Sequence, residues 1–388
     1  MVTTFLGYEH DRVQHGGRPR IVRDVAYMLR DLGFLVTIAQ KGSRDRTILF
    51  DDGITVRKYK VPVRSWSDVL FALRTRPLVR AADVCCYASC EDGFPFFAKR
   101  SFGIQHGIWW DKPHGSFITR NLVSQLQFWR LAALCKSAAR VICVDTNVIN
   151  WLRLYGSIGH KAAEKCTYLP NYFDTAVFTP PTRFLIEARF SGRHLIYVRR
   201  FERPRGALLF VEMCKLLRDR GFQFSASMIG WGNEQAAVCA LIEKYGLEET
   251  IRVAEADFDA VSEILRTAAV AIVPTIYSEG TSLSCIEAIG MGIPVVTTDV
   301  GGLGNLVIPG FNGYIVKASA DQLATSVEAA LSSLDQYMSL ATHCIQMRDS
   351  FTFGKWRESV IHILRESGLL PEAHSEAAIP AAPEPTRA

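Results

Sequence analysis

Short apolar runs alternate with amphipathic segments along the N-terminal half of the chain. Apolar residues at helical spacing predict a helix over residues 20–32, which Gly33 ends. The runs that predict strands lie at residues 2–7, 34–39, 84–88, 102–105 and 141–144. Strands that alternate with helices form parallel sheets covered on both faces, so this half predicts an α/β domain.

The C-terminal half repeats the same alternation. The apolar runs predict strands at residues 194–198, 223–229, 251–254, 269–274 and 294–298. The amphipathic segments predict helices at residues 207–220, 234–245 and 261–267. The segment 178–191 lies between the two halves and contains Pro180 and Pro181, so we expect a domain boundary there.

Length and composition support two globular domains. The chain has 388 residues, of which 48% are hydrophobic and 21% are charged. No apolar run approaches the roughly 18 residues that would span a membrane, and the apolar start of the chain is too short for a signal peptide. The ten cysteines are scattered without a C-x-x-C spacing, which favours reduced thiols. These features predict a cytoplasmic protein.

Positive charge is concentrated in the N-terminal third. Residues 1–130 hold 20 Lys and Arg against 12 Asp and Glu, whereas the remainder holds 24 against 27. A basic domain can attract an anionic acceptor or the anionic inner face of a membrane. A solvated surface with no partner explains the same charge, and the sequence leaves both interpretations open.

The segment 277–316 is the most informative part of the chain. Glu279 precedes a predicted helix and Glu287 lies inside it, so both carboxylates can face one cleft. Carboxylates accept hydrogen bonds from vicinal hydroxyls, as on a ribose or a hexose. The amides that open the helix, at Gly280, Thr281, Ser282 and Leu283, are a natural seat for phosphate. This order of hydroxyl and phosphate binders predicts a nucleotide-sugar site.

This segment resembles the E-x7-E signature of retaining glycosyltransferases of the GT-B fold, family 4. The similarity continues through EAIGMGIPVV and the following GG to NGYIV. It implies two Rossmann-like α/β domains whose parallel sheets face each other across a deep cleft. The implied reaction moves a hexose from a nucleoside-diphosphate sugar to a hydroxyl of a glycan or lipid-linked acceptor, in cell-envelope polysaccharide synthesis.

The resemblance also assigns roles to charged side chains. In the implied retaining mechanism the leaving diphosphate assists the acceptor hydroxyl, so the protein stabilises charge and positions the substrates. Glu279 would hold hexose hydroxyls and Glu287 the ribose. The segment RRFERPRG resembles the family's G-R-L-x-x-x-K-G, which makes Arg200 and Arg205 the diphosphate ligands. Arg199 replaces the usual Gly, which puts the close approach of the backbone in doubt.

Further site residues are implied by shorter similarities. His106 follows a predicted strand, and in the family a His at such a position contacts the donor sugar. Gly16 and Gly17 resemble the Gly-rich loop that approaches the donor phosphate. Gly230 and Gly232 match the family's loop near the diphosphate.

The resemblance also sets the expected domain limits. YLPNYFDTAVF is similar to the family's inter-domain segment, with Tyr172 where Gly is usual, which suggests a differently shaped turn. We expect an acceptor-binding domain over residues 1–178 and a donor-binding domain over residues 179–345. A helix over 346–366 would cross back to the first domain, and residues 367–388 are rich in Ala, Pro and Glu and predict a disordered tail.

Other interpretations remain open. The D-x-D of residues 257–259 precedes a predicted helix, so capping explains it, and we expect no metal and no bound cofactor. The G-x-G at Gly230 and Gly232 is a partial dinucleotide fingerprint, which Gln235 weakens in the third place. A nucleotide-sugar epimerase of the same fold and a non-catalytic relative are the alternatives to a transferase. We expect no nucleic-acid partner.

Overall fold

The computed structural model describes residues 2–3, 17–50, 53–61, 67–111, 116–255 and 258–371, which fall into two compact units. Among these residues, the first unit contains those up to His106, 116–169 and those from Arg357 on. The second unit contains 107–111 and 170–356. The domain limits expected at residues 178, 345 and 366 stay predictions.

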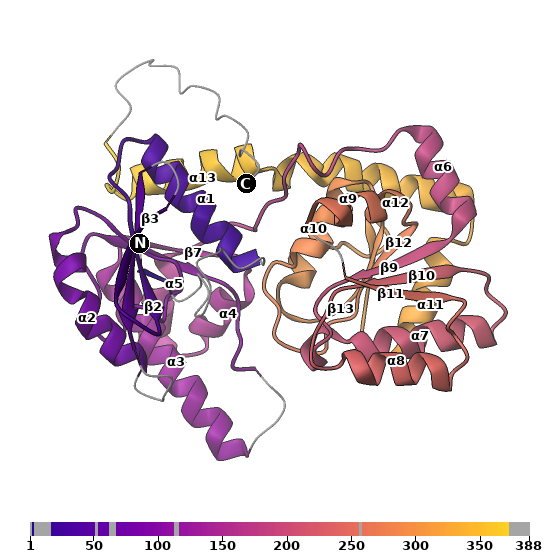
Figure 1. Ribbon diagram of the computed structural model, residues 1–388, viewed down its shortest axis with the longest axis horizontal. Coiled ribbons are helices and arrows are strands. Elements are labelled where there is room, and N and C mark those ends of the chain that lie inside the picture. Colours follow the sequence, from indigo (N-terminus) through magenta and orange to yellow (C-terminus); the bar gives the residue numbers. More distant parts are fainter. Residues whose placement is uncertain are drawn as a thin grey trace. The chain divides into compact units, whose positions relative to one another are not determined.

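The first unit is built on a sheet of eight described strands (Figure 1). The strands are β1 (Val2–Thr3), β2 (Thr37–Gly42), β3 (Arg46–Phe50), β4 (Ile54–Lys60), β5 (Cys85–Tyr87), β6 (Ser101–Gln105), β7 (Arg140–Cys143) and β8 (Cys166–Tyr168). Their order is β3-β4-β2-β1-β5-β6-β7-β8, and every pairing is parallel except that of β3 with β4. The helices are α1 (Gly17–Asp31), α2 (Ser67–Ala81), α3 (Phe117–Ser137), α4 (Asn147–Arg153) and α5 (Gly156–Glu164).

The second unit has a six-stranded parallel sheet of order β11-β10-β9-β12-β13-β14. Its strands are β9 (His194–Val198), β10 (Ser225–Ile229), β11 (Ile251–Ala254), β12 (Val270–Val273), β13 (Val295–Thr298) and β14 (Gly313–Val316). Its helices are α6 (Arg183–Gly192), α7 (Ala207–Asp219), α8 (Gln235–Lys244), α9 (Phe258–Arg266), α10 (Leu283–Gly290), α11 (Ala320–Ala330) and α12 (Leu334–Met347). Three short 3-10 helices lie at η1 (Arg203–Arg205), η2 (Gly301–Asn305) and η3 (Arg348–Phe351), and α13 (Phe353–Glu366) follows. This strand order is that of a doubly wound dinucleotide-type fold, in which the strand order reverses between β9 and β12.

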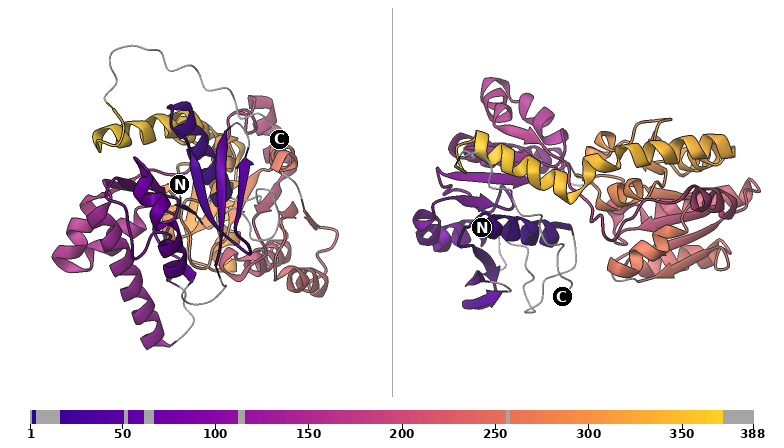
Figure 2. Two further views of the ribbon diagram at one scale, coloured as in Figure 1. Left: turned by 60° about the vertical axis from the view of Figure 1, so that its left-hand side comes forward. Right: turned by 90° about the horizontal axis from the view of Figure 1, so that it is seen from above.

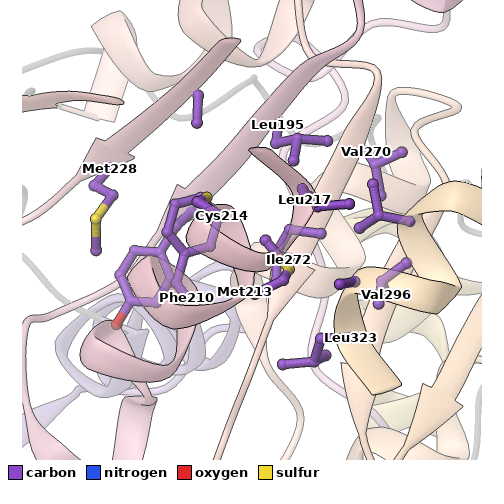
Figure 3. Packing of buried hydrophobic residues seen from close by; sticks show 14 of the residues in the cluster. Leu195, Phe210, Met213, Cys214, Leu217, Met228, Val270, Ile272, Val296 and Leu323 are labelled. Carbon is purple, nitrogen blue, oxygen red and sulfur yellow. The ribbon is translucent and has the colours of Figure 1, made fainter. Parts of the chain in front are cut away.

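Alternate residues of each strand in the second unit feed two cores. Leu195, Met228 and Val270 point to one face of the sheet, where they pack against α7, α8 and α11 (Figures 1 and 3). Ile196 and Ala271 point to the other face, against α9 and α10. Side chains alternate across a pleated strand, so a strand buried on both faces reads as a continuous apolar run, which is why these strands were predictable.

Most predicted elements are confirmed with small shifts of their ends. The helix expected at residues 20–32 begins at Gly17, because Pro19 is well tolerated in a first turn. The strand expected at 2–7 is observed at Val2–Thr3, and residues 4–7 lie outside the described part. The antiparallel pair of β3 and β4, which turns at Gly53 with φ +90°, was not expected from the apolar runs.

Tyr172 occupies the position where the resembled family has Gly. Its side chain is 1% exposed, and its ring centroid lies 4.6 Å from that of Trp356 and 5.0 Å from that of Phe353. The segment that follows β8 is therefore held by aromatic packing at this point. The expectation of a differently shaped turn at Tyr172 stays a prediction.

Candidate functional site

The candidate donor site lies at the carboxyl ends of β9 and β12. Ligands of doubly wound sheets bind at such a reversal of strand order, because the loops on either side diverge and leave a crevice. The loop after β9 carries Arg199, Arg200 and Arg205, and the loop after β12 carries Thr275 and Glu279. The topology therefore brings together two segments separated by about 75 positions in the sequence.

One carboxylate oxygen joins these two loops. Glu279 Oε2 accepts from Arg199 Nη2, from Arg205 Nη1 at 2.8 Å and from Thr275 Oγ1 at 3.1 Å. Thr275 Oγ1 in turn accepts from Arg199 Nη1 at 2.5 Å. Only 6% of the Arg199 side chain and 8% of the Glu279 side chain are exposed. We call Arg199, Arg205, Thr275 and Glu279 the Glu279 cluster; it carries one more positive than negative charge.

Opposing effects act on the ionisable groups of this cluster. Burial raises the pKa of Glu279. The positive charges of Arg199 and Arg205 and the hydrogen bonds from Arg199 and Thr275 lower it by more, so the pKa lies below its usual value. Burial lowers the pKa of Arg205, and Glu279 raises it. An arginine stays protonated even so, and the cluster is ionised at neutral pH.

The loop after β9 is fixed by packing beneath it. Tyr197 on β9 donates its phenolic hydrogen to the carbonyls of Arg200, at 3.0 Å, and Arg205, at 3.3 Å. Gly206 has φ +70°, and a Cβ there would lie 1.8 Å from the carbonyl oxygen of Pro274. Only glycine fits both conditions, so the backbone of one loop rests directly on that of the other.

The loop after β12 is held in a sparsely populated conformation just before Glu279. Ser278 has φ +64°, which is unusual for a residue with a Cβ. Its carbonyl accepts from Arg205 Nη1 at 3.1 Å, and its hydroxyl donates to the carbonyl of Ile108 at 2.9 Å. These contacts offset the strain and aim the next side chain, Glu279, at the two arginines.

Arg200 differs from the other two arginines in its exposure. Its side chain is 55% exposed, and its recorded ion pair is with Glu202, 2.7 Å from Nη1 to Oε1. Surface pairs of this kind contribute little and exchange readily. Arg200 can therefore turn toward an incoming anion, whereas Arg199 and Arg205 are already held in place.

The start of α10 lies on the polypeptide just beyond Glu279. Thr281 is tied to Asn171, whose backbone amide and Nδ2 donate to Thr281 Oγ1 and to its carbonyl, both at 3.3 Å. Ser282 is the N-cap residue, but its Oγ accepts no amide of the first turn and lies 3.1 Å from the Oγ of Ser284. The first amides of a helix have no partner within the helix, so those that open α10 at Leu283 suit an anionic ligand.

The second glutamate of the pair is inside this helix, as expected. Glu287 lies on α10 and is 6% exposed. A carboxylate at this depth needs hydrogen-bond donors around it, which distinguishes it from a solvated surface glutamate.

Gly230 and Gly232 follow β10 and pack against the loop after β9. A Cβ on Gly230 would lie 2.1 Å from the carbonyl oxygen of Arg199, and one on Gly232 would lie 2.3 Å from that of Phe201. The close backbone approach therefore comes from the β10 loop, although Arg199 has replaced the family's Gly. A dinucleotide fingerprint follows the first strand of its sheet, here β9, so this G-x-G does not stand where such a fingerprint would.

The remaining expected site residues lie in the first unit. His106 follows β6, and its Nε2 lies 2.7 Å from the carbonyl oxygen of Ala88, so this nitrogen carries the proton. Gly17 opens α1, whereas Gly16 lies outside the described residues. Their parts in a donor site stay predictions.

Neither a metal centre nor a membrane span is recorded within the described ranges. No group of three or more potential ligands lies together there. No described helix combines the length and the apolar character that crossing a bilayer requires. Of the D-x-D, Asp257 lies outside the described residues and Asp259 lies on α9.

Two residues of the cluster were not recognised from the sequence. Arg199 was treated as a departure from the family pattern, and Thr275 was not considered. A buried arginine leaves no local signal, because its partner is 80 positions away. The hint that the sequence offered for Thr275 is its position just after the apolar strand β12, since polar residues that follow such strands often belong to a site.

Comparison with solved structures identifies the fold. The chain is similar to a sucrose-phosphate synthase from Thermosynechococcus elongatus, with a TM-score of 0.75 and 18% identity over 94% of this chain and 97% of the other. It is also similar to HepE of Anabaena, solved in complex with UDP and glucose, with a TM-score of 0.70 and 16% identity over 94% and 98%. The chain has the GT-B fold, with two Rossmann-like units, and that prediction is confirmed.

The second finding concerns the family. Residues 188–345, within the second unit, match the family model described as Glycosyl transferases group 1. The D-inositol 3-phosphate glycosyltransferase of Paenarthrobacter aurescens is 28% identical over 227 residues, 53% of this chain and 55% of the relative. WcaL of Salmonella typhimurium, whose name proposes a glycosyltransferase of colanic acid biosynthesis, is 30% identical over 163 residues, 40% of each chain. The matched part thus spans about half the length of these relatives or less.

Proposed function

We propose that the protein is a retaining, metal-independent glycosyltransferase that moves a hexose from a nucleoside-diphosphate sugar to a glycan or lipid-linked hydroxyl. The observation that supports this most is the Glu279 cluster at the reversal of strand order in the second unit. Its excess positive charge and the adjacent start of α10 suit a diphosphate. The match of residues 188–345 to a glycosyltransferase family supports the same reaction class.

Each charged residue has a proposed task. Arg200 turns from Glu202 to the diphosphate, while Arg205 supplies a fixed positive charge beside it. Among the described residues, every recorded contact to the Glu279 carboxylate ends on Oε2, so we assign Oε1 to a hexose hydroxyl. Glu287 is assigned to the ribose.

The chemistry follows from charge stabilisation. As the bond from the sugar to the diphosphate breaks, negative charge grows on the leaving oxygens, and the arginines and helix amides stabilise it. The departing diphosphate accepts the proton of the acceptor hydroxyl, which attacks the same face of the sugar. The buried contacts around Glu279 hold these hydrogen-bond donors in place before the reaction, so they need not rearrange as the charge develops.

Relatives suggest the setting and the donor. HepE binds UDP and glucose in its solved complex, and WcaL is named for the biosynthesis of a polysaccharide. By analogy, we propose a uridine nucleotide donor, a cytoplasmic location and a part in cell-envelope polysaccharide synthesis.

Calorimetric titration with UDP, GDP, ADP and NAD tests the nucleotide site. We expect one nucleoside diphosphate to bind, and Arg200→Ala to weaken it about 10- to 100-fold, because a charge-assisted hydrogen bond contributes roughly 1.5–3 kcal/mol. Arg183→Ala is the matched control, since Arg183 also forms an exposed pair, with Glu187 at 3.0 Å. Unchanged affinity in the Arg200 variant would remove that residue from the site.

Glu279→Ala and Glu287→Ala separate the two proposed hydroxyl ligands. The Glu287 variant should lose nucleotide affinity, whereas the Glu279 variant should lose mainly turnover. Equal loss of both quantities in both variants would contradict the assignment. The anomeric configuration of the product, observed by NMR, tests retention, and turnover in excess EDTA tests metal independence. Binding of NAD alone, or sugar conversion without an acceptor, would instead indicate a dehydrogenase or an epimerase.

A further inference from the structure

Helix α3 exposes a row of large apolar side chains. Ile118, Leu122, Leu126 and Trp129 are 70%, 66%, 49% and 54% exposed, and we call them the α3 stripe. They are four, four and three positions apart, which places them on one side of a helix. With a rise of 1.5 Å per residue, the stripe is about 16 Å long.

The opposite side of the same helix packs into the core of the first unit. Phe128, Leu131, Leu134 and Cys135 are buried in the first unit. A helix that only covers a core has a polar outer face, whereas α3 is apolar on both sides. Scattered exposed leucines need no explanation, but a continuous row of four indicates a binding surface.

Helix α3 is firmly seated on the unit. The ring of Phe128 stacks on that of Tyr155 with centroids 4.0 Å apart, and Ser124 Oγ lies 2.8 Å from Tyr155 Oη. The views agree that the N-terminal part of α3 extends beyond the sheet of its own unit (Figures 1 and 2). The stripe is thus presented on a rigid support.

The charges of α3 have one sign. Its 21 residues include Arg120, Arg130 and Lys136 but no Asp or Glu. Arg130 is buried and pairs with Asp68 at 2.9 Å, so Arg120 and Lys136, which are exposed, remain to meet an external anion. Lys136 follows Trp129 by seven positions and lies on the same side of the helix as the stripe, whereas Arg120 lies about 200° around the helix axis from Ile118.

We infer that the α3 stripe docks on the surface of a bilayer that contains anionic lipids. Leucine, isoleucine and tryptophan insert at the boundary of headgroups and acyl chains, and flanking cations bind acidic headgroups. Four partly exposed side chains offer only a few hundred Å², well below the roughly 800 Å² per partner of a stable protein interface. The single sign of charge also favours an anionic surface over a second copy of this chain.

This inference concerns the first unit and does not depend on the proposed donor site. Membrane docking would help the proposed enzyme to reach a lipid-linked acceptor. When enzyme and acceptor are both held at the membrane surface, the effective concentration of each for the other rises.

Vesicle co-sedimentation with the full chain tests the proposal. We expect the protein to bind vesicles of phosphatidylcholine with phosphatidylglycerol, to bind phosphatidylcholine alone less well, and to dissociate as salt is raised. Leu122→Glu and Trp129→Glu should each weaken binding at least tenfold. Leu35→Glu is the control, because Leu35 is 101% exposed in the same unit but away from α3.

A second pair of substitutions separates the electrostatic contribution to vesicle binding from the apolar one. Arg120→Glu with Lys136→Glu should abolish the preference for anionic vesicles. Absence of vesicle binding by the unmodified protein, or binding by Leu122→Glu equal to that of the Leu35 control, would overturn the proposal. So would a dimer in analytical ultracentrifugation that Leu122→Glu converts to a monomer. Nucleotide affinity should be unchanged in all these variants, which keeps this test distinct from that of the donor site.

Discussion

At the scale of single residues, Glu279 is an anchored carboxylate. Three donors converge on its Oε2, and two of them come from the loop after β9. The buried guanidinium of Arg199 and the partly buried one of Arg205 need an acceptor here, because an unpaired buried charge is strongly unfavourable. Glu279 therefore has a structural task in addition to the proposed contact with the sugar.

A double-mutant cycle measures that structural task. Arg199→Ala should lower the free energy of unfolding by about 3 kcal/mol, since removal of one partner of a buried pair leaves the other charge uncompensated. Glu279→Gln should cost a similar amount, and the double variant should cost less than the sum. Urea unfolding gives these values, with the exposed Arg200→Ala as a control expected within about 0.5 kcal/mol of the unmodified protein. Additive single effects would show that the two side chains do not interact.

The stability of the same pair should depend on pH. The pKa of Glu279 lies below 4.5 in the folded protein, so its contribution is complete above the unfolded value and is lost as the pH falls through the folded value. The difference in free energy of unfolding between the unmodified protein and Glu279→Gln should be constant above about pH 5 and shrink below about pH 4. A difference that stays constant down to pH 3 would contradict the lowered pKa.

At the scale of elements, the site depends on loops that touch through their backbones. Gly206 rests on Pro274, and Gly301, at the start of η2, rests on Glu279. Gly301 has φ +56°, and a Cβ there would lie 2.1 Å from the carbonyl oxygen of Glu279. The amide of Gly302 donates to that same carbonyl at 3.2 Å. The loops after β9, β12 and β13 therefore form one packed layer.

Gly301→Ala tests this layer against a matched position. It should lower the free energy of unfolding by about 2 kcal/mol or more and reduce turnover, because Glu279 must move. Gly304→Ala, in the same 3-10 helix, meets nothing within 4 Å and should change stability by less than about 0.5 kcal/mol. Thermal unfolding and steady-state kinetics compare the two, and equal effects would exclude the steric explanation.

At the scale of the whole molecule, the two units have separate sheets, and the charged residues proposed to bind the nucleotide all lie in the second. Hydrogen exchange followed by mass spectrometry should show that UDP slows exchange in peptides that cover the loops after β9 and β12 and the start of α10. Peptides from β2, β4 and α2 should exchange at an unchanged rate, since a ligand stabilises the regions that it contacts. Protection confined to the first unit would move the nucleotide site there.

Much of the fold could be predicted from the sequence. Five of the six strands of the second unit are apolar runs because both faces of its sheet are covered, so each of these was visible by itself. The edge strand β14 was missed, because most of its residues are only partly buried. The pair of β3 and β4 was missed, because β4 alternates buried and exposed residues and reads as polar. For the site, Glu279 and Glu287 were found because they belong to one contiguous motif.

The sequence by itself determined the local chemistry of this protein: the Glu pair, the arginine-rich loop and the glycines that allow tight turns, since each is encoded within a few consecutive residues. Only the tertiary structure decided which of these groups meet. It placed Arg199, which looked like a departure from the pattern, against Glu279, and it left one of the two apolar sides of α3, the α3 stripe, exposed. Both outcomes depend on contacts between segments far apart in the chain, and such contacts leave no periodic signal in a single sequence.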